Sequence, residues 1–118
     1  MDEGDYRRNA EHRKRVRAAW IAAARQYLDG QLSVFEVADR LHLVRVYEPQ
    51  WWDIVTPFIA LWSDSDGLPI APKVRALWSP EALKHEDERI ALLAQSYADD
   101  IRAAAEDLIH ALQIDETS

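Results

Sequence analysis

The residues best suited to hold a metal ion form the run Asp64-Ser65-Asp66-Gly67. This run resembles the middle of an EF-hand calcium loop, where carboxylates alternate and a glycine follows at position six. With Gly67 at that position, loop positions one and twelve fall on Trp62 and Lys73, where the motif requires carboxylates. We therefore interpret the run as an Asx turn closed by Gly67 and expect no bound metal.

Acid–histidine pairs with helical spacing occur twice, as Asp39-x-x-His42 and Asp107-x-x-His110. Di-iron helical bundles use inward-facing Glu-x-x-His pairs. Here the acid is aspartate in both pairs, and both lie off the apolar stripes of their segments. We interpret all four residues as surface residues rather than as metal ligands.

No residue pattern in the chain indicates catalysis. The sequence has no cysteine, which excludes disulfides, thiolate metal sites and cysteine nucleophiles. It also has no G-x-S-x-G, phosphate loop, dinucleotide fingerprint or H-E-x-x-H motif. Since acid–base chemistry needs positioned groups that the sequence does not point to, we predict a protein that is not an enzyme and needs no cofactor.

Charge is distributed unevenly along the 118 residues, which carry 21 acids and 14 bases for a net charge of −7. Residues 1–50 have 9 bases and 8 acids, net +1, whereas residues 51–118 have 5 bases and 13 acids, net −8. An acidic body repels nucleic acid phosphates and attracts basic proteins. The sequence therefore favours a basic protein as partner and disfavours nucleic acid.

The location of the protein is expected to be cytoplasmic. The N-terminal residues Met1–Asp5 are acidic, whereas a secretory signal begins with basic residues followed by an apolar stretch. The longest apolar run, Ile54–Trp62, has nine residues and contains Pro57, whereas a membrane span needs about 20. No membrane association is predicted.

The elements that would position these residues are predicted to be helices in one domain, 1–118. We expect an all-α fold: an irregular antiparallel bundle of about four helices, with a long C-terminal helix and a long ordered Pro/Gly loop before it. The first helix starts near Asp5 and ends at Asp29-Gly30, and residues 1–10 have little to bury and are prone to fray. Ser33–Glu36 forms a capping box for the second helix, whose buried face includes either Leu43 or Val44.

The third predicted element, residues 48–62, leaves two alternatives open. It is one helix kinked at Pro57, or two helices, the second capped by Thr56. Periodicity alone does not exclude a strand for the apolar run, but helix is preferred because the sequence offers no second convincing strand to pair with it. Residues 63–79 form the loop, and five apolar side chains are expected to anchor it: Leu68, Ile70, Val74, Leu77 and Trp78. Ser79 and Pro80 begin the last helix, of roughly 33 residues.

One short segment resembles the first helix of a helix-turn-helix DNA reader, namely Leu32–Leu41. The segment that would then contact DNA bases, Glu48–Ile54, contains no arginine or lysine. Gln50 alone gives it little capacity to recognise bases. A nucleic-acid-associated regulator that uses the basic first helix is the alternative function. A small helical subunit or homo-oligomer with the last helix as its seam is a further alternative.

A family of small uncharacterised bacterial proteins resembles this chain in the segments Leu28–Ser33, Ser63–Ile70 and Leu77–Leu83, and at Arg75, Asp87 and Glu88. Some members resemble immunity proteins, which neutralise toxins delivered between competing bacteria. The resemblance spans about Tyr27 to Tyr97 and implies binding to a partner rather than catalysis.

The function expected from charge and resemblance together is binding and neutralising a basic toxin, for example a nuclease. Exposed tryptophan beside carboxylates suits a protein-binding surface. The residues expected to contact the partner are Trp51, Trp62, Asp64, Asp66, Glu86, Asp87, Glu88, Asp99 and Asp100. Arg75 and Trp78 are assigned to the structure of the loop. Arg75 is expected to fork onto Asp64, Asp66 or Asp87. Arg75→Ala is therefore expected to lower the melting temperature by several degrees.

Overall fold

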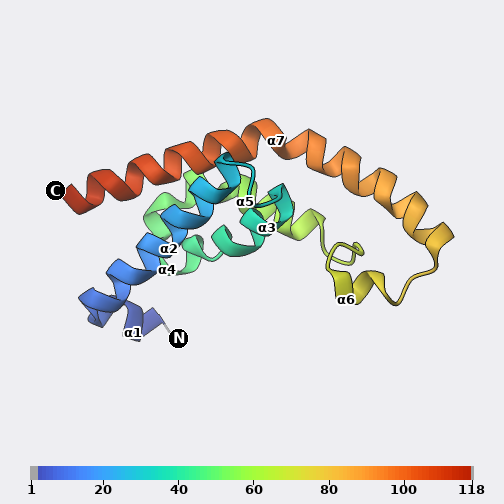
Figure 1. Ribbon diagram of the computed structural model, residues 1–118. Coiled ribbons are helices and arrows are strands. Elements are labelled where there is room, and N and C mark those ends of the chain that lie inside the picture. The colour runs from blue at the N-terminus through green and yellow to red at the C-terminus, as the bar shows by residue number, and fades with distance from the viewer. Residues whose placement is uncertain (1–2, 118) are drawn as a thin grey trace.

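The computed structural model describes residues 3–117, and every regular element within them is helical (Figure 1). In chain order these elements are α1 (Glu3–Arg8), α2 (Ala10–Leu28), α3 (Val34–Leu41), α4 (Val44–Tyr47), the 3-10 turn η1 (Pro49–Trp51), α5 (Trp52–Asp64), α6 (Pro72–Arg75) and α7 (Pro80–Thr117). The predicted all-α class with a long C-terminal helix is confirmed, and a strand at Ile54–Trp62 is excluded.

Helix α7 is the spine of the molecule. Its C-terminal half packs on α2, α3 and α5, whereas its N-terminal half extends past them toward the loop that contains α6 (Figure 1). The helix has 38 residues, which at 1.5 Å per residue is about 57 Å. It is longer than predicted because the helical segment continues beyond Leu112 to Thr117.

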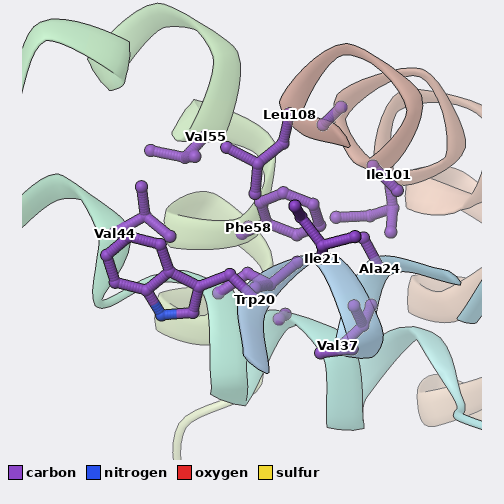
Figure 2. Packing of buried hydrophobic residues seen from close by; sticks show 14 of the residues in the cluster. Trp20, Ile21, Ala24, Val37, Val44, Val55, Phe58, Ile101 and Leu108 are labelled. Carbon is purple, nitrogen blue, oxygen red and sulfur yellow. The ribbon is translucent and has the colours of Figure 1, made fainter. Parts of the chain in front are cut away.

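The core lies where four helices meet, and Figure 2 shows its side chains. Phe58 of α5 lies at its centre and is fully buried, as are Ala24 of α2, Val37 of α3 and Leu108 of α7. Val44 is also buried while Leu43 is 43% exposed, which decides the alternative that the sequence left open. Alanines such as Ala24 allow α2 to approach its neighbours closely, so a small chain encloses a closely packed core.

The N-terminal segment differs from the single helix predicted for it. Asn9 ends α1 and caps α2, since its side-chain oxygen accepts a hydrogen bond of 3.0 Å from the His12 amide. Tyr6 of α1 is only 1% exposed and packs against the rings of Trp20 and Tyr47. The expectation that residues 1–10 have little to bury is therefore wrong at Tyr6.

The helix starts follow the predicted capping chemistry. At α3 the Glu36 amide donates to the Ser33 hydroxyl at 3.1 Å, and the Ser33 amide donates to the Glu36 carboxylate at 3.0 Å. At α7 the Ala82 amide donates to the Ser79 hydroxyl at 3.2 Å. These bonds satisfy backbone donors that have no partner within the helix, which fixes where each helix begins.

Helix α5 is one helix that contains Pro57, not two. Thr56 does not cap a second helix, because its hydroxyl donates to the Trp52 carbonyl at 2.8 Å. The helix begins at Trp52 rather than at Glu48, since Pro49 starts the short turn η1 instead. Packing of Val55, Phe58 and Leu61 into the core offsets the backbone hydrogen bond that proline cannot make.

The loop between α5 and α7 is anchored differently from the prediction. Pro69 is fully buried, and Leu68 and Ile70 are partly covered. By contrast, Val74, Leu77 and Trp78 are 39%, 86% and 37% exposed, so their assignment as anchors is corrected. The reason is geometric: α6 is a single turn that lies beside the part of α7 extending past the bundle, where no core is within reach (Figure 1).

Arg75 forks onto Asp87 of α7 with hydrogen bonds of 2.6 and 3.0 Å, and it also donates to the Pro69 carbonyl at 3.2 Å. It does not bond to Asp64 or Asp66, so only one of the three expected partners is correct. The hydrogen bond from Arg75 lowers the pKa of Asp87 below its usual value. Both side chains of the pair are at least a third exposed.

Because exposed ion pairs contribute little to stability, Arg75→Ala is expected to leave the melting temperature almost unchanged. This expectation replaces the loss of several degrees that the sequence alone predicts. Hydrogen exchange of the loop amides between Ser65 and Ser79 is expected to accelerate, because the fork is the ion pair that joins the loop to α7. Thermal denaturation and exchange measurements check both points, with Arg89→Ala as the control. A melting temperature lowered by several degrees would contradict the expectation.

Candidate functional site

A groove of about 870 Å³ lies between the start of α3, the end of α5 and the loop that follows. Its size is within the range of pockets that hold ligands of several hundred daltons. The residues that line it are Ser33, Phe35, Glu36, Asp39, Trp62, Ser63, Ser65, Asp66, Gly67, Leu68, Ile70, Ala71, Pro72 and Val74. Gly67 adopts a φ of 81°, which lets the chain turn sharply out of α5 along the groove.

The groove combines apolar and acidic side chains. Phe35, Trp62, Leu68, Ile70 and Val74 supply apolar surface, and 41% of Trp62 is exposed. The charged residues among those that line it are all acids: Glu36, Asp39 and Asp66. The two bases of α6 are not among the lining residues. The groove therefore offers an apolar surface under a negative potential.

His42 holds Trp62 in place from behind. The two rings are stacked with their centroids 4.1 Å apart and their planes within 12°. His42 is only 8% exposed, so its interpretation as a surface residue is wrong, and within residues 3–117 its Nδ1 has no hydrogen-bond partner. Burial lowers the pKa of His42 below its ordinary value, although the nearby Asp39 carboxylate opposes this shift. The imidazole is consequently neutral near pH 7.

Asp64 and Asp66 have different surroundings although they are two residues apart. Asp64 accepts a hydrogen bond from the Tyr97 hydroxyl, which joins the end of α5 to α7. This bond raises the pKa of Tyr97 to about 12. Asp66 lines the groove. The turn that contains both is closed by backbone bonds from the Ser65 amide to Leu61 (2.9 Å) and from the Asp66 amide to Ser63 (3.2 Å).

The other predicted contact residues do not gather at the groove. Asp87 pairs with Arg75 and Glu86 with Arg89, whereas Glu88, Asp99 and Asp100 are exposed along α7. Of the nine residues predicted to contact a partner, Trp62 and Asp66 line the groove.

Trp51 lines a second, shallower pocket of about 560 Å³, and its ring lies 5.2 Å beneath the Arg17 guanidinium. Asp107 and His110, one of the two acid–histidine pairs, line the same pocket. Arg17 is itself engaged in ion pairs with Glu48 and Asp115. We therefore interpret this pocket as part of a structural contact between α2, η1 and α7.

That contact centres on Glu48, which sequence analysis did not identify. Glu48 is 7% exposed and accepts hydrogen bonds from the Tyr6 hydroxyl (2.6 Å), Arg17 Nε (2.8 Å) and Gln50 Nε2 (2.7 Å). Arg17 also pairs with Asp115 near the end of α7. Because every partner comes from a different element or turn, no local sequence signal points to this network.

Glu36 and Asp39 of the groove were missed for a related reason. Both lie on the exposed side of a short amphipathic helix, where charge is normal. Only the placement of the α5–α6 loop beside α3 turns this face into one wall of a groove.

Neither a metal centre nor a membrane span is found in the part of the chain that the structure describes. Residues 3–117 contain no cluster of three or more histidine or acidic side chains arranged to hold a metal ion. None of their helices is both long and apolar enough to cross a membrane. The chain is thus an all-α protein with an acidic, tryptophan-containing groove; comparisons with family models, curated proteins and solved structures find no match to it.

Proposed function

We propose that the protein binds and neutralises a basic protein in the cytoplasm, in the manner of an immunity protein acting on a toxin domain such as a nuclease. The observation that carries the proposal is the groove, where exposed Trp62 lies among Glu36, Asp39 and Asp66 with no base among the lining residues. Tryptophan is enriched at the energetic centres of protein interfaces, and the carboxylates select a positive partner.

Long-range charge supports the same partner class. Residues 51–118 have a net charge of −8, and Glu88, Asp99 and Asp100 extend the negative surface along α7. Such a field accelerates encounter with a positively charged protein and makes the rate of association sensitive to salt. A nuclease that binds phosphates is basic at its active site, so an acidic protein can occlude that site without doing chemistry.

The test begins with capture of partners from cells that encode the protein, followed by work with the purified partner. We expect a basic partner whose enzymatic activity is lost on binding. Its affinity is expected to fall at least about tenfold between 50 and 500 mM salt, because exposed charges are screened. Affinity that does not change with salt, or a partner that stays active in the complex, would contradict the proposal.

The nucleic-acid alternative rests on the exposed bases of α1 and α2, among them Arg7, Arg8, Lys14 and Arg15. Its reading segment Glu48–Ile54 spans η1 and the first turn of α5, and it contains no base. Binding of random-sequence DNA at low salt, lost when Lys14 and Arg15 are neutralised, is the result that would favour this alternative.

A further inference from the structure

We propose that the groove between α3, α5 and the following loop takes an arginine of the partner, carried on a short segment with an apolar neighbour. In this arrangement the guanidinium lies on the exposed face of Trp62 and pairs with Asp39 and Asp66. The inference rests on the proposed function, because it names the part of the basic partner that the groove recognises.

The first argument is that the groove holds negative charge that the chain leaves uncompensated. Glu36 is partly engaged, since its carboxylate accepts the Ser33 amide in the capping box. The carboxylates of Asp39 and Asp66 accept no hydrogen bond and form no ion pair with any other residue in the described part of the chain. Both line the same groove, so a single cation there is attracted by both.

The second argument concerns Trp62 and distinguishes arginine from lysine. Trp51 lies beneath Arg17 at 5.2 Å, and Trp52 lies beneath Arg45 at 5.9 Å. Trp62 is stacked on neutral His42 instead and is 41% exposed. A guanidinium is planar and weakly hydrated, so it stacks on an indole and forks onto a carboxylate at once, which an ammonium group cannot do.

The third argument is the size and lining of the groove. Its volume of about 870 Å³ is more than one arginine side chain fills. The remaining surface is apolar, from Phe35, Leu68, Ile70 and Val74. An apolar residue next to the arginine therefore completes the occupant. Nucleic acid does not fit this groove, because the three carboxylates repel its phosphates.

The test uses synthetic peptides as probes, so it does not depend on finding the partner. The peptide acetyl-Ser-Leu-Arg-Leu-Ser-amide is compared with versions in which lysine, citrulline or glutamate replaces the arginine. Binding is followed by NMR titration of the ¹⁵N-labelled chain, including the Trp62 indole N–H. We expect the arginine peptide to shift groove resonances, the lysine peptide to bind at least about threefold more weakly, and the citrulline and glutamate peptides to bind at least about tenfold more weakly.

Variants locate the interaction. Asp39→Asn with Asp66→Asn is expected to weaken arginine-peptide binding at least about tenfold. Asp99→Asn with Asp100→Asn makes the same change in net charge on α7 outside the groove, and it is expected to weaken binding less than about twofold. Trp62→Leu is expected to reduce the preference for arginine over lysine, and far-ultraviolet circular dichroism confirms that each variant is folded.

The inference is overturned if citrulline binds as well as arginine, if the α7 variant loses as much affinity as the groove variant, or if no groove resonance shifts at 10 mM peptide. Failure of the inference and failure of the proposed function are distinguishable. A basic partner that binds the Asp39→Asn, Asp66→Asn protein normally retains the proposed function but rules out the groove as its contact. Arginine-selective binding in the groove, without neutralisation of any basic partner, retains the inference about the groove but rules out the proposed function.

Discussion

An Arg17→Met variant is expected to lose about 3 kcal/mol of unfolding free energy, because removal of one partner leaves the other as an uncompensated buried charge. The side chains of Arg17 and Glu48 are only 12% and 9% exposed. Arg17 also pairs with Asp115, so the change removes this ion pair between α2 and the end of α7 as well. For a domain of this size the loss corresponds to roughly 10 °C or more in melting temperature, measurable by thermal and urea denaturation.

The pH dependence of this loss identifies its cause. Burial alone would raise the pKa of Glu48, but hydrogen bonds from Tyr6, Gln50 and Arg17 outweigh it and hold the pKa below its ordinary value. A carboxyl group with a lowered folded pKa contributes stability that is complete above its unfolded pKa of about 4.3 and is lost as the pH falls through the folded pKa. The difference in unfolding free energy between wild type and Arg17→Met is therefore expected to shrink as the pH falls from about 4.3 through the folded pKa of Glu48.

Two further variants serve as controls for Arg17→Met. Arg15→Met makes the same change on an exposed position of α2, and it is expected to alter stability little. The double change Arg17→Met, Glu48→Met removes both charges, so it is expected to be less destabilising than the sum of the single changes. A loss that is the same at pH 7 and pH 3, or equal for Arg15→Met, would show that the buried charge pair is not its source.

The helix boundaries were largely predictable because their signals are local. The capping residues are close in sequence to the amides they cap, and Pro80 directly follows the cap Ser79 at the first position of α7. Their effect therefore does not depend on the rest of the fold. Asn9 is a cap of the same kind, but the continuous helical pattern around it obscured the break between α1 and α2. Pro57 was ambiguous because sequence alone does not show whether packing compensates for a proline within a helix.

The candidate site was predicted only in part, for the opposite reason. Trp62 and Asp66 were identified by residue type, but Glu36 and Asp39 enter the groove through the approach of segments far apart in the chain. The burial of His42 has the same origin, since its ring is covered by Trp62 from α5. Leu77 and Trp78 show the converse error, because apolar character was interpreted as an anchor where the loop lies beyond the core.

A Phe58→Ala variant is expected to lose about 3–5 kcal/mol of unfolding free energy, which is the cost of removing an aromatic ring and leaving a cavity in a rigid core. Phe58 is fully buried and lies among side chains of α2, α3 and α7 (Figure 2). The neighbouring helices cannot easily move in to fill the cavity, because α7 is also held by the Tyr97–Asp64 and Arg17–Asp115 contacts, which lie on either side of its core-facing segment. Urea denaturation monitored by circular dichroism measures the loss.

Matched variants separate the cavity from the general effect of shortening an apolar side chain. Phe58→Leu keeps most of the volume and is expected to lose clearly less than Phe58→Ala, since part of the cavity stays filled. Leu92→Ala truncates a residue of α7 that is 67% exposed, so it is expected to change stability by less than about 0.5 kcal/mol. If Phe58→Ala cost no more than Leu92→Ala, the four helices would not close around Phe58, and α3 and α5 would have no fixed relation on which to build the groove.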